Sequence, residues 1–136
     1  MKVLLAAIQD KYYASALAPP VTNGLWLNEA PQGTPLPLIT YQIVSDDPDP
    51  AWGSHSMDQV TMLFNIWQAD TEGDETSGVE RIEDLYGLFK TAFDECALTI
   101  PGYTHIRMSR EMANLFKSLD GGWQYAMTYR ILTQET

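Results

Sequence analysis

The chain has 136 residues, of which 45% are hydrophobic and 19% charged, and its formal net charge is -10. This composition is typical of a globular protein and excludes a long disordered chain. No apolar run approaches the roughly 18 residues of a membrane span. So acidic a balance also argues against a general nucleic-acid binder, because phosphate binding requires clustered Lys and Arg. We expect a single domain over residues 1–136 that makes no membrane contact.

The chain begins with a predicted helix and two predicted strands. Apolar side chains recur with helical period over residues 2–18, and Pro19-Pro20 would end that helix. Residues 24–28 predict a short strand, and the Pro- and Gly-containing segment 30–35 predicts a turn. Residues 37–45 predict a second strand, because their side chains alternate between two faces.

An acidic loop and a long strand come next. Residues 46–56 predict an irregular loop, since two prolines there lack the amide hydrogen that a central strand requires. Residues 59–69 alternate throughout and predict the longest strand. Its second face is apolar for a surface exposed to solvent, and consists of Thr61, Leu63, Asn65 and Trp67. Burial within the domain would explain this face, and so would a partner subunit.

The second helix has the clearest pattern. Ser77-Gly78-Val79-Glu80 matches a capping box, in which the Ser hydroxyl and the Glu carboxylate satisfy free amide groups at a helix start. Apolar residues between Val79 and Phe93 then recur with helical spacing, and most charged residues lie off that stripe. We therefore predict a helix that begins at the capping box.

The C-terminal part predicts two more strands, over residues 103–110 and 123–133, with a loop over 112–122 between them. Asp120-Gly121-Gly122 favours a hairpin turn, so these strands are expected to pair antiparallel. The element order is then α-β-β-β-α-β-β. This order indicates an α+β fold, a mostly antiparallel sheet of about five strands with two helices packed on one face.

No motif for catalysis or for a cofactor is recognisable. The sequence lacks a phosphate-binding loop, a Gly-x-Ser-x-Gly elbow and paired zinc-ligand motifs. His55 and His105 lie far apart, in a predicted loop and a predicted strand. The single cysteine, Cys96, excludes an intrachain disulfide and is expected to be a small core residue. We predict no catalytic, cofactor or metal site, and no enzyme activity.

Charge is distributed unevenly along the chain. Residues 46–95 hold thirteen Asp or Glu but only Arg81 and Lys90 as basic residues. This stretch either keeps the protein soluble, or forms a charged surface that repels DNA or meets a basic partner. Calcium could bind the acidic loop, but the loop lacks the Gly and Glu positions of an EF-hand.

Two tryptophans are of interest for recognition, because Trp is enriched where proteins meet. Trp52 lies in the acidic loop, where local packing and an interface are equally good explanations. Trp67 lies on a predicted strand and is expected either in the core or on a sheet face. The candidate interface or lumen residues are Asp46, Asp47, Asp49, Trp52, Trp67, Arg107, Arg110 and Lys117.

Four segments resemble the tail-completion (tail-terminator) family of long-tailed bacteriophages. The stretch from Asn28 to Asp46, NEAPQGTPLPLITYQIVSD, is similar to the family segment that leads into a strand. VTMLFNIWQA (Val60 to Ala69) and IEDLYGLF (Ile82 to Phe89) match the strand and helix that follow, and WQYAMTYRI (Trp123 to Ile131) resembles the last strand. The likeness covers nearly the whole chain in element order, and its motifs are structural.

The resemblance implies a structural virion protein. Members form a ring, usually of six subunits, at the head-proximal end of the tail, after assembly in the host cytoplasm. The ring stops polymerisation of the tail tube and presents a surface to the head connector. Expected partners are therefore further copies of the chain, the tail tube protein and the head-tail connector protein. DNA would pass through the ring without specific binding, and the acidic stretch could line the lumen.

A second class of function also fits the charge. An acidic inhibitor, or a DNA mimic, binds a basic partner through charge complementarity. Such proteins usually spread carboxylates over one continuous face, and that class does not account for the family likeness. The stretch from Tyr103 to Asp120 is longer than in the shortest tail-terminator members, and its role stays open.

Overall fold

The computed structural model describes residues 2–18, 21, 24–49, 57–69, 75–117 and 122–135. In this part of the chain the elements follow the predicted order, which confirms the α+β class. They are α1 (Lys2–Tyr13), β1 (Leu25–Leu27), β2 (Leu38–Asp49), β3 (Met57–Gln68), α2 (Glu75–Phe93), β4 (Tyr103–Lys117) and β5 (Trp123–Glu135).

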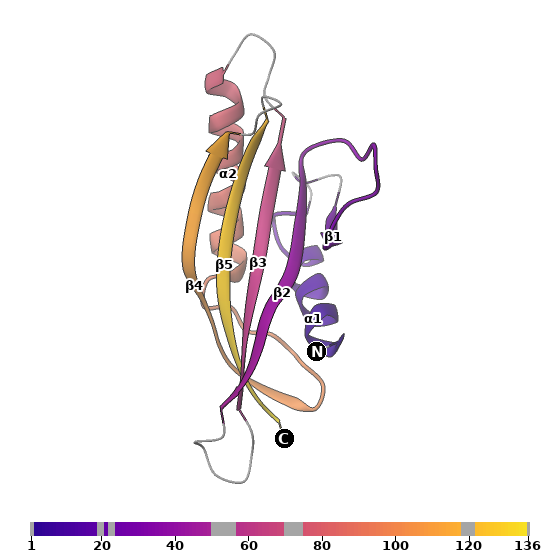
Figure 1. The fold of residues 1–136 in the computed structure, drawn as a ribbon, viewed down its shortest axis with the longest axis vertical. Coiled ribbons are helices and arrows are strands. Elements are labelled where there is room, and N and C mark those ends of the chain that lie inside the picture. Colours follow the sequence, from indigo (N-terminus) through magenta and orange to yellow (C-terminus); the bar gives the residue numbers. More distant parts are fainter. Residues whose placement is uncertain are drawn as a thin grey trace.

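The strands form one sheet in the order β1-β2-β3-β5-β4, with β4 at one edge and β1 at the other (Figure 1). The four long strands pair antiparallel, as the hairpin chemistry predicts for β4 and β5. Only β1 is parallel to its neighbour, and it pairs with no more than Ile39, Thr40 and Tyr41 of β2. The described part of β2 beyond Tyr41 therefore has no strand on that side.

Both helices pack on one face of the sheet and share a single hydrophobic core with it. Phe64 of β3 is fully buried at its centre. The Phe64 ring centroid lies 5.0 Å from that of Phe89 and 5.7 Å from that of Phe93, both on α2, and 5.6 Å from that of Tyr129 on β5. Such tilted and edge-to-face contacts add to the free energy gained by burying the rings. The predicted apolar stripe of α2 is therefore the face that meets the sheet.

Both helices have different limits from those predicted. The first helix was predicted to reach residue 18, but α1 ends at Tyr13. Ser15 turns the chain there, because its hydroxyl donates to the Tyr12 carbonyl at 2.6 Å and accepts from the Leu17 amide at 3.2 Å. A Ser side chain that bonds nearby backbone competes with helical hydrogen bonds. The second helix begins at Glu75, two residues before the predicted capping box, so Ser77 lies inside the first turn.

The prediction of an irregular loop over residues 46–56 is wrong for residues 46–49. β2 continues to Asp49, and Pro48 pairs in register with Asp58 of β3. Proline is excluded from central strands but tolerated at a sheet edge, where its missing amide would face away from the neighbouring strand. Because β1 ends well before this point, the end of β2 is such an edge. Residues 50–56, including Pro50 and Trp52, lie outside the described part of the chain.

The loop predicted over 112–122 is also wrong in its first half. β4 runs to Lys117, and its last residues pair with β5 from Thr128 back to Trp123. The register shifts between His105 and Arg107 and again between Arg110 and Met112. A bulge reverses which residues face the core, so no single alternation runs through the strand. Residues 118–121, most of the predicted hairpin turn, lie outside the described part.

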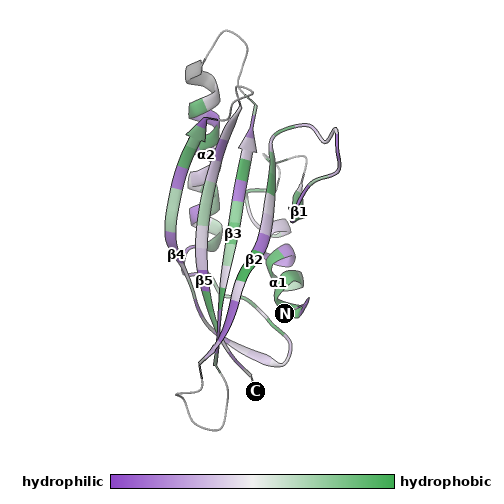
Figure 2. Cartoon of the chain, in the orientation of Figure 1, coloured by the Kyte–Doolittle hydropathy of each residue, from purple (hydrophilic) through white to green (hydrophobic). Residues whose placement is uncertain are grey.

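No described helix covers the second face of the sheet. Polar side chains satisfy one another there: Gln124 Nε2 donates to Asn65 Oδ1 at 2.9 Å, and Trp67 Nε1 donates to Thr40 Oγ1 at 3.0 Å. Figure 2 shows hydrophobic and hydrophilic residues interspersed along these strands. Asn65 is buried and Trp67 half-buried, so part of the apolar character predicted for this face is explained within the domain.

Candidate functional site

The predicted acidic residues lie together on the free end of β2. Asp46 and Asp47 are exposed and pair in register with Val60 and Gln59 of β3. Partial burial and the nearby carboxylates of Asp58 and Asp47 raise the pKa of Asp46 above its ordinary value. The backbone of Asp49 pairs with Met57 at the end of the strand. This end of the sheet is therefore a site of like-charge repulsion.

The predicted basic residues lie on β4, at the opposite edge of the sheet. Arg107 forms a double contact with Glu95, from Nε to Oε2 at 3.0 Å and from Nη2 to Oε1 at 2.9 Å. This pairing lowers the pKa of Glu95, and both side chains are more than half exposed. The Lys117 ammonium lies 5.3 Å from the Trp123 ring centroid, within cation–π range. The structure thus separates the predicted acidic and basic residues onto two edges.

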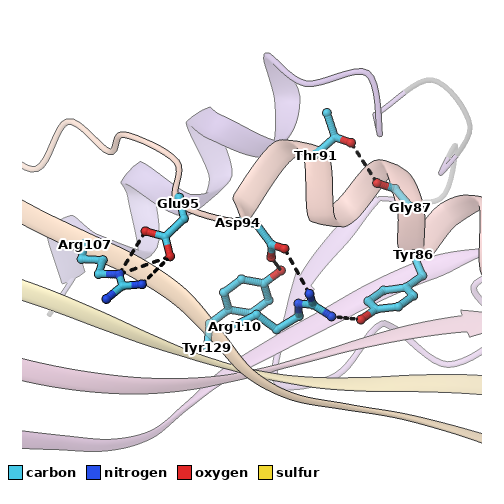
Figure 3. A network of polar contacts seen from close by, with 8 residues as sticks. All are labelled: Tyr86, Gly87, Thr91, Asp94, Glu95, Arg107, Arg110 and Tyr129. Atoms are coloured by element: carbon cyan, nitrogen blue, oxygen red, sulfur yellow. Dashed lines mark hydrogen bonds and ion pairs between the residues drawn. The ribbon is translucent and has the colours of Figure 1, made fainter.

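A polar network joins the end of α2 to β4 and β5 (Figure 3). The Tyr129 hydroxyl donates to Asp94 Oδ1 at 2.5 Å, and Arg110 Nη2 lies 3.3 Å from Asp94 Oδ2. Arg110 Nη1 also donates to the Tyr86 hydroxyl. Tyr129 is fully buried, and that burial, with the hydrogen bond to Asp94, raises the pKa of its phenol. Sequence reasoning selected Arg110 alone; its partners have no motif that could have identified them.

Trp67 borders a shallow pocket on the helix-free face. The pocket holds about 230 Å³ and is lined chiefly by the β1–β2 connection and by Leu38, Thr40 and Trp67. Leu36, at its rim, is 40% exposed. A groove of about 430 Å³ lies elsewhere, between α2 and the end of β3, and includes Arg81 and Asp84. Neither cavity brings together a nucleophile and a base.

Cys96 and His105 are both partly buried near the start of β4. The Cys96 thiol lies 3.6 Å from Met108 Sδ, and burial raises the pKa of Cys96, which disfavours the reactive thiolate. His105 Nδ1 accepts a hydrogen bond from the Leu98 amide at 3.1 Å. His55 lies outside the described residues, so the structure does not place the two histidines relative to each other.

Within the described ranges, no three His, Cys, Asp or Glu side chains are grouped closely enough to hold a metal ion. Most of the predicted acidic loop lies outside those ranges. The structure therefore does not test calcium binding there, and the expected absence of a metal site stays a prediction. No helix in the described part of the chain is long and apolar enough to cross a membrane.

Comparison with solved structures identifies a similar fold over almost the entire chain. A chain from the structure "Virion of native gene transfer agent (GTA) particle" superimposes with a TM-score of 0.73 and 15% sequence identity. The match covers 95% of this chain and 92% of that chain. No protein-family model matches the sequence, and no curated protein matches it. The likeness thus establishes a shared fold.

Proposed function

We propose that this protein is a non-enzymatic structural component of a tailed, phage-like virion. The observation that carries the proposal is the end-to-end fold likeness to a chain of a gene transfer agent virion. The match covers 95% of this chain and 92% of that chain, so the likeness extends over nearly the whole of both. The sequence resemblance to tail-terminator proteins supports the same class independently.

Within the virion, we propose that the protein terminates the tail tube, joins the tail to the head, or does both. It would act as a ring of identical copies, six by analogy with the family, at the head-proximal end of the tail. Its partners would be the tail tube protein and the head-tail connector protein. DNA would pass through the ring without specific contacts, and acidic residues lining the lumen would repel the phosphates.

The competing proposal, an acidic inhibitor or DNA mimic, has less support. Such a protein needs carboxylates over one continuous face to match a basic partner. Here three of the eight basic residues, Arg107, Arg110 and Lys117, lie on a single strand at one edge of the sheet. The positive charge therefore interrupts any acidic surface at that edge.

Deletion of the gene from the virus or virus-like element that encodes it tests the proposal. Electron microscopy of the lysate should show overlong tubes if the protein terminates the tail, and separate DNA-filled heads and tails if it joins them. A plasmid copy of the gene should restore normal particles. Normal, infectious particles from the deletion strain would overturn the proposal, and a pull-down for a basic partner would then follow.

A further inference from the structure

The edge strands of the sheet differ in the charges that their own side chains carry. Residues 24–49, which include β1 and β2, contain four acidic residues and no Lys or Arg. The acidic residues are Glu29, Asp46, Asp47 and Asp49. β4, at the other edge, contains three basic residues against the single acid Glu111. In a chain with a net charge of -10, this contrast between the edges is not a consequence of overall composition.

Exposed apolar side chains also concentrate at these edges. Within the described residues, six large hydrophobic side chains are at least 40% exposed. Met112 and Phe116 belong to β4, whereas Leu27, Leu36 and Val44 belong to the β1–β2 edge. The remaining one is Tyr13 of α1. Apolar groups that cluster in this way are typical of surfaces that another protein covers.

The register places complementary groups in the same rows across the sheet. One row runs from Phe116 through Gln124 and Trp67 to Leu38. It begins at an exposed aromatic ring and ends at the apolar pocket of the helix-free face. Another row runs from Arg107 through Leu132 and Gln59 to Asp47. The first row therefore has an aromatic side chain at one end and an apolar pocket at the other. The second row has a cation at one end and a carboxylate at the other.

Strand direction allows a second copy to continue the sheet. β2 and β5 run one way, and β3 and β4 run the other way. If copies are related by rotation about an axis along the strands, β4 of one copy lies antiparallel to β2 of the next. Among the described residues, β4 has no strand on its outer side, and β2 has none beyond Tyr41. In the register of these rows, the stretches free to pair are Ser109–Met112 of β4 and Gln42–Ser45 of β2. Unpaired strand edges are templates for such pairing.

We propose that β4 of one copy docks against the β1–β2 edge of the next copy. This proposal rests on the proposed function, and it specifies the contact that closes the ring. Phe116 meets the apolar pocket near Leu36 and Leu38. Met112 then lies opposite Gln42, and Arg107 approaches Asp47. Glu95 holds Arg107 only through an exposed ion pair, which contributes little to stability and leaves the guanidinium accessible. Since the contact uses two different patches on each copy, it propagates from copy to copy until the assembly closes.

Cysteine cross-linking tests this contact directly. Ser45 and Ser109 end one row, through Thr61 and Arg130. Within one copy they are separated by three interstrand spacings, about 14 Å, beyond the roughly 7 Å between Cα atoms that a disulfide tolerates. In a Cys96→Ser background, oxidised particles carrying Ser45→Cys and Ser109→Cys should therefore yield a ladder of disulfide-linked multimers. If the register between copies is offset by two residues, the ladder should form instead in a variant that carries Asp47→Cys and Ser109→Cys.

The matched control pairs Ser109→Cys with Tyr13→Cys, which lies on α1 and belongs to neither edge. This control should give no ladder. Absence of multimers from both edge-to-edge variants, in particles shown by immunoblot to contain the protein, would overturn the contact and leave the proposed function intact. Absence of the wild-type protein from purified particles would overturn the proposed function and the contact together.

A charge exchange provides a second test that does not depend on disulfide geometry. Arg107→Asp and Asp47→Arg should each reduce incorporation into particles at least several-fold, because each places like charges in contact. Both positions are exposed, and the Arg107–Glu95 contact that one variant removes is an exposed ion pair. The isolated variants should therefore unfold within a few degrees of the wild-type thermal midpoint. The double variant should restore incorporation. If the single variants incorporate normally, or the double variant is as defective as both singles combined, the pairing is wrong.

Discussion

The hydroxyl of Tyr129 contributes to stability separately from the ring that carries it. The ring packs against Phe64 and Phe89 in the core, while the hydroxyl donates to Asp94 Oδ1 at 2.5 Å. Tyr129→Phe should keep the packing and lose a hydrogen bond to a charged acceptor, at a cost of about 1.5–3 kcal/mol. Urea denaturation of the purified protein measures this change.

Tyr41→Phe is the matched control for that experiment. Tyr41 is also buried, but its hydroxyl accepts a hydrogen bond from the neutral amide of Gln9 at 3.1 Å. Its loss should cost only about 0.5–1.5 kcal/mol. Equal costs for the two variants would show that Asp94 adds nothing beyond an ordinary neutral partner.

His105 should make the fold sensitive to mild acid. Partial burial lowers the pKa of His105 below 6.5, and its Nδ1 accepts from the Leu98 amide, so a proton placed on Nδ1 would break that bond. The unfolded chain therefore binds more protons than the folded chain as pH falls through and below 6.5. Stability is complete above that range and declines as the pH falls towards the lowered pKa of the folded state.

Thermal midpoints between pH 7.5 and pH 5, conditions spanning the ordinary His pKa of about 6.5, test this expectation. His105→Asn removes the titrating group and should flatten the decline. The same pH series with His55→Asn distinguishes the contribution of His105 to the acid sensitivity from that of His55. An unchanged slope in His105→Asn would assign the acid sensitivity to other groups.

At the scale of elements, the sequence predicted those strands and helices in which one period holds throughout. β3 and β5 alternate from end to end, and the stripe of α2 keeps helical spacing up to Phe93. β4 was predicted only to Arg110, because the register shift after that residue moves the inward positions from Met108 to Ala113 and Leu115. The predicted strand ends at residue 45, four residues before β2 does, because Pro48 argues against a central strand. The sequence does not reveal that this end of β2 is an edge.

The candidate site was predictable to a similar degree. Composition selected Asp46, Asp47, Arg107 and Arg110 as charged residues of interest, but their distribution over opposite edges follows from strand order, which is a long-range property. Likewise, Glu95 and Asp94 lie directly after a well-predicted helix. Nothing local indicates that they meet arginines twelve and sixteen residues further along the chain.

Substitutions near the end of β4 test whether it is a strand. Leu115 packs partly against the core, whereas Phe116 on the opposite face is 50% exposed. Leu115→Ala should therefore cost about 1–2 kcal/mol, less than a fully buried leucine because its burial is partial. Phe116→Ala should stay within about 0.5 kcal/mol, as surface substitutions do. If removal of the larger Phe116 side chain proves more destabilising in chemical denaturation, the facing assigned here is wrong.

For the molecule as a whole, charge opposes folding. The chain has eighteen acidic residues and eight basic ones. In the two ion pairs given above and in the one between Arg130 and Glu111, each side chain is at least 30% exposed. Exposed pairs contribute at most about 1 kcal/mol each, whereas a net charge of -10 destabilises the compact state through self-repulsion. Raising NaCl from about 20 mM to about 0.5 M shortens the screening length to a few ångström, so it should raise the thermal midpoint.

Asp46 is the position at which this repulsion is best measured. Because burial and the neighbouring carboxylates raise its pKa, its negative charge is disfavoured in the folded state, and its contribution to stability is lost as pH rises through that pKa. Asp46→Asn should therefore stabilise the protein at pH 7 in low salt, by less than about 1 kcal/mol given its exposure, and by less still in high salt. Asp46→Glu keeps the charge and should show no gain. If Asp46→Asn is instead destabilising at low salt, the carboxylate must have a favourable partner, and the like-charge repulsion assigned to the free end of β2 is wrong.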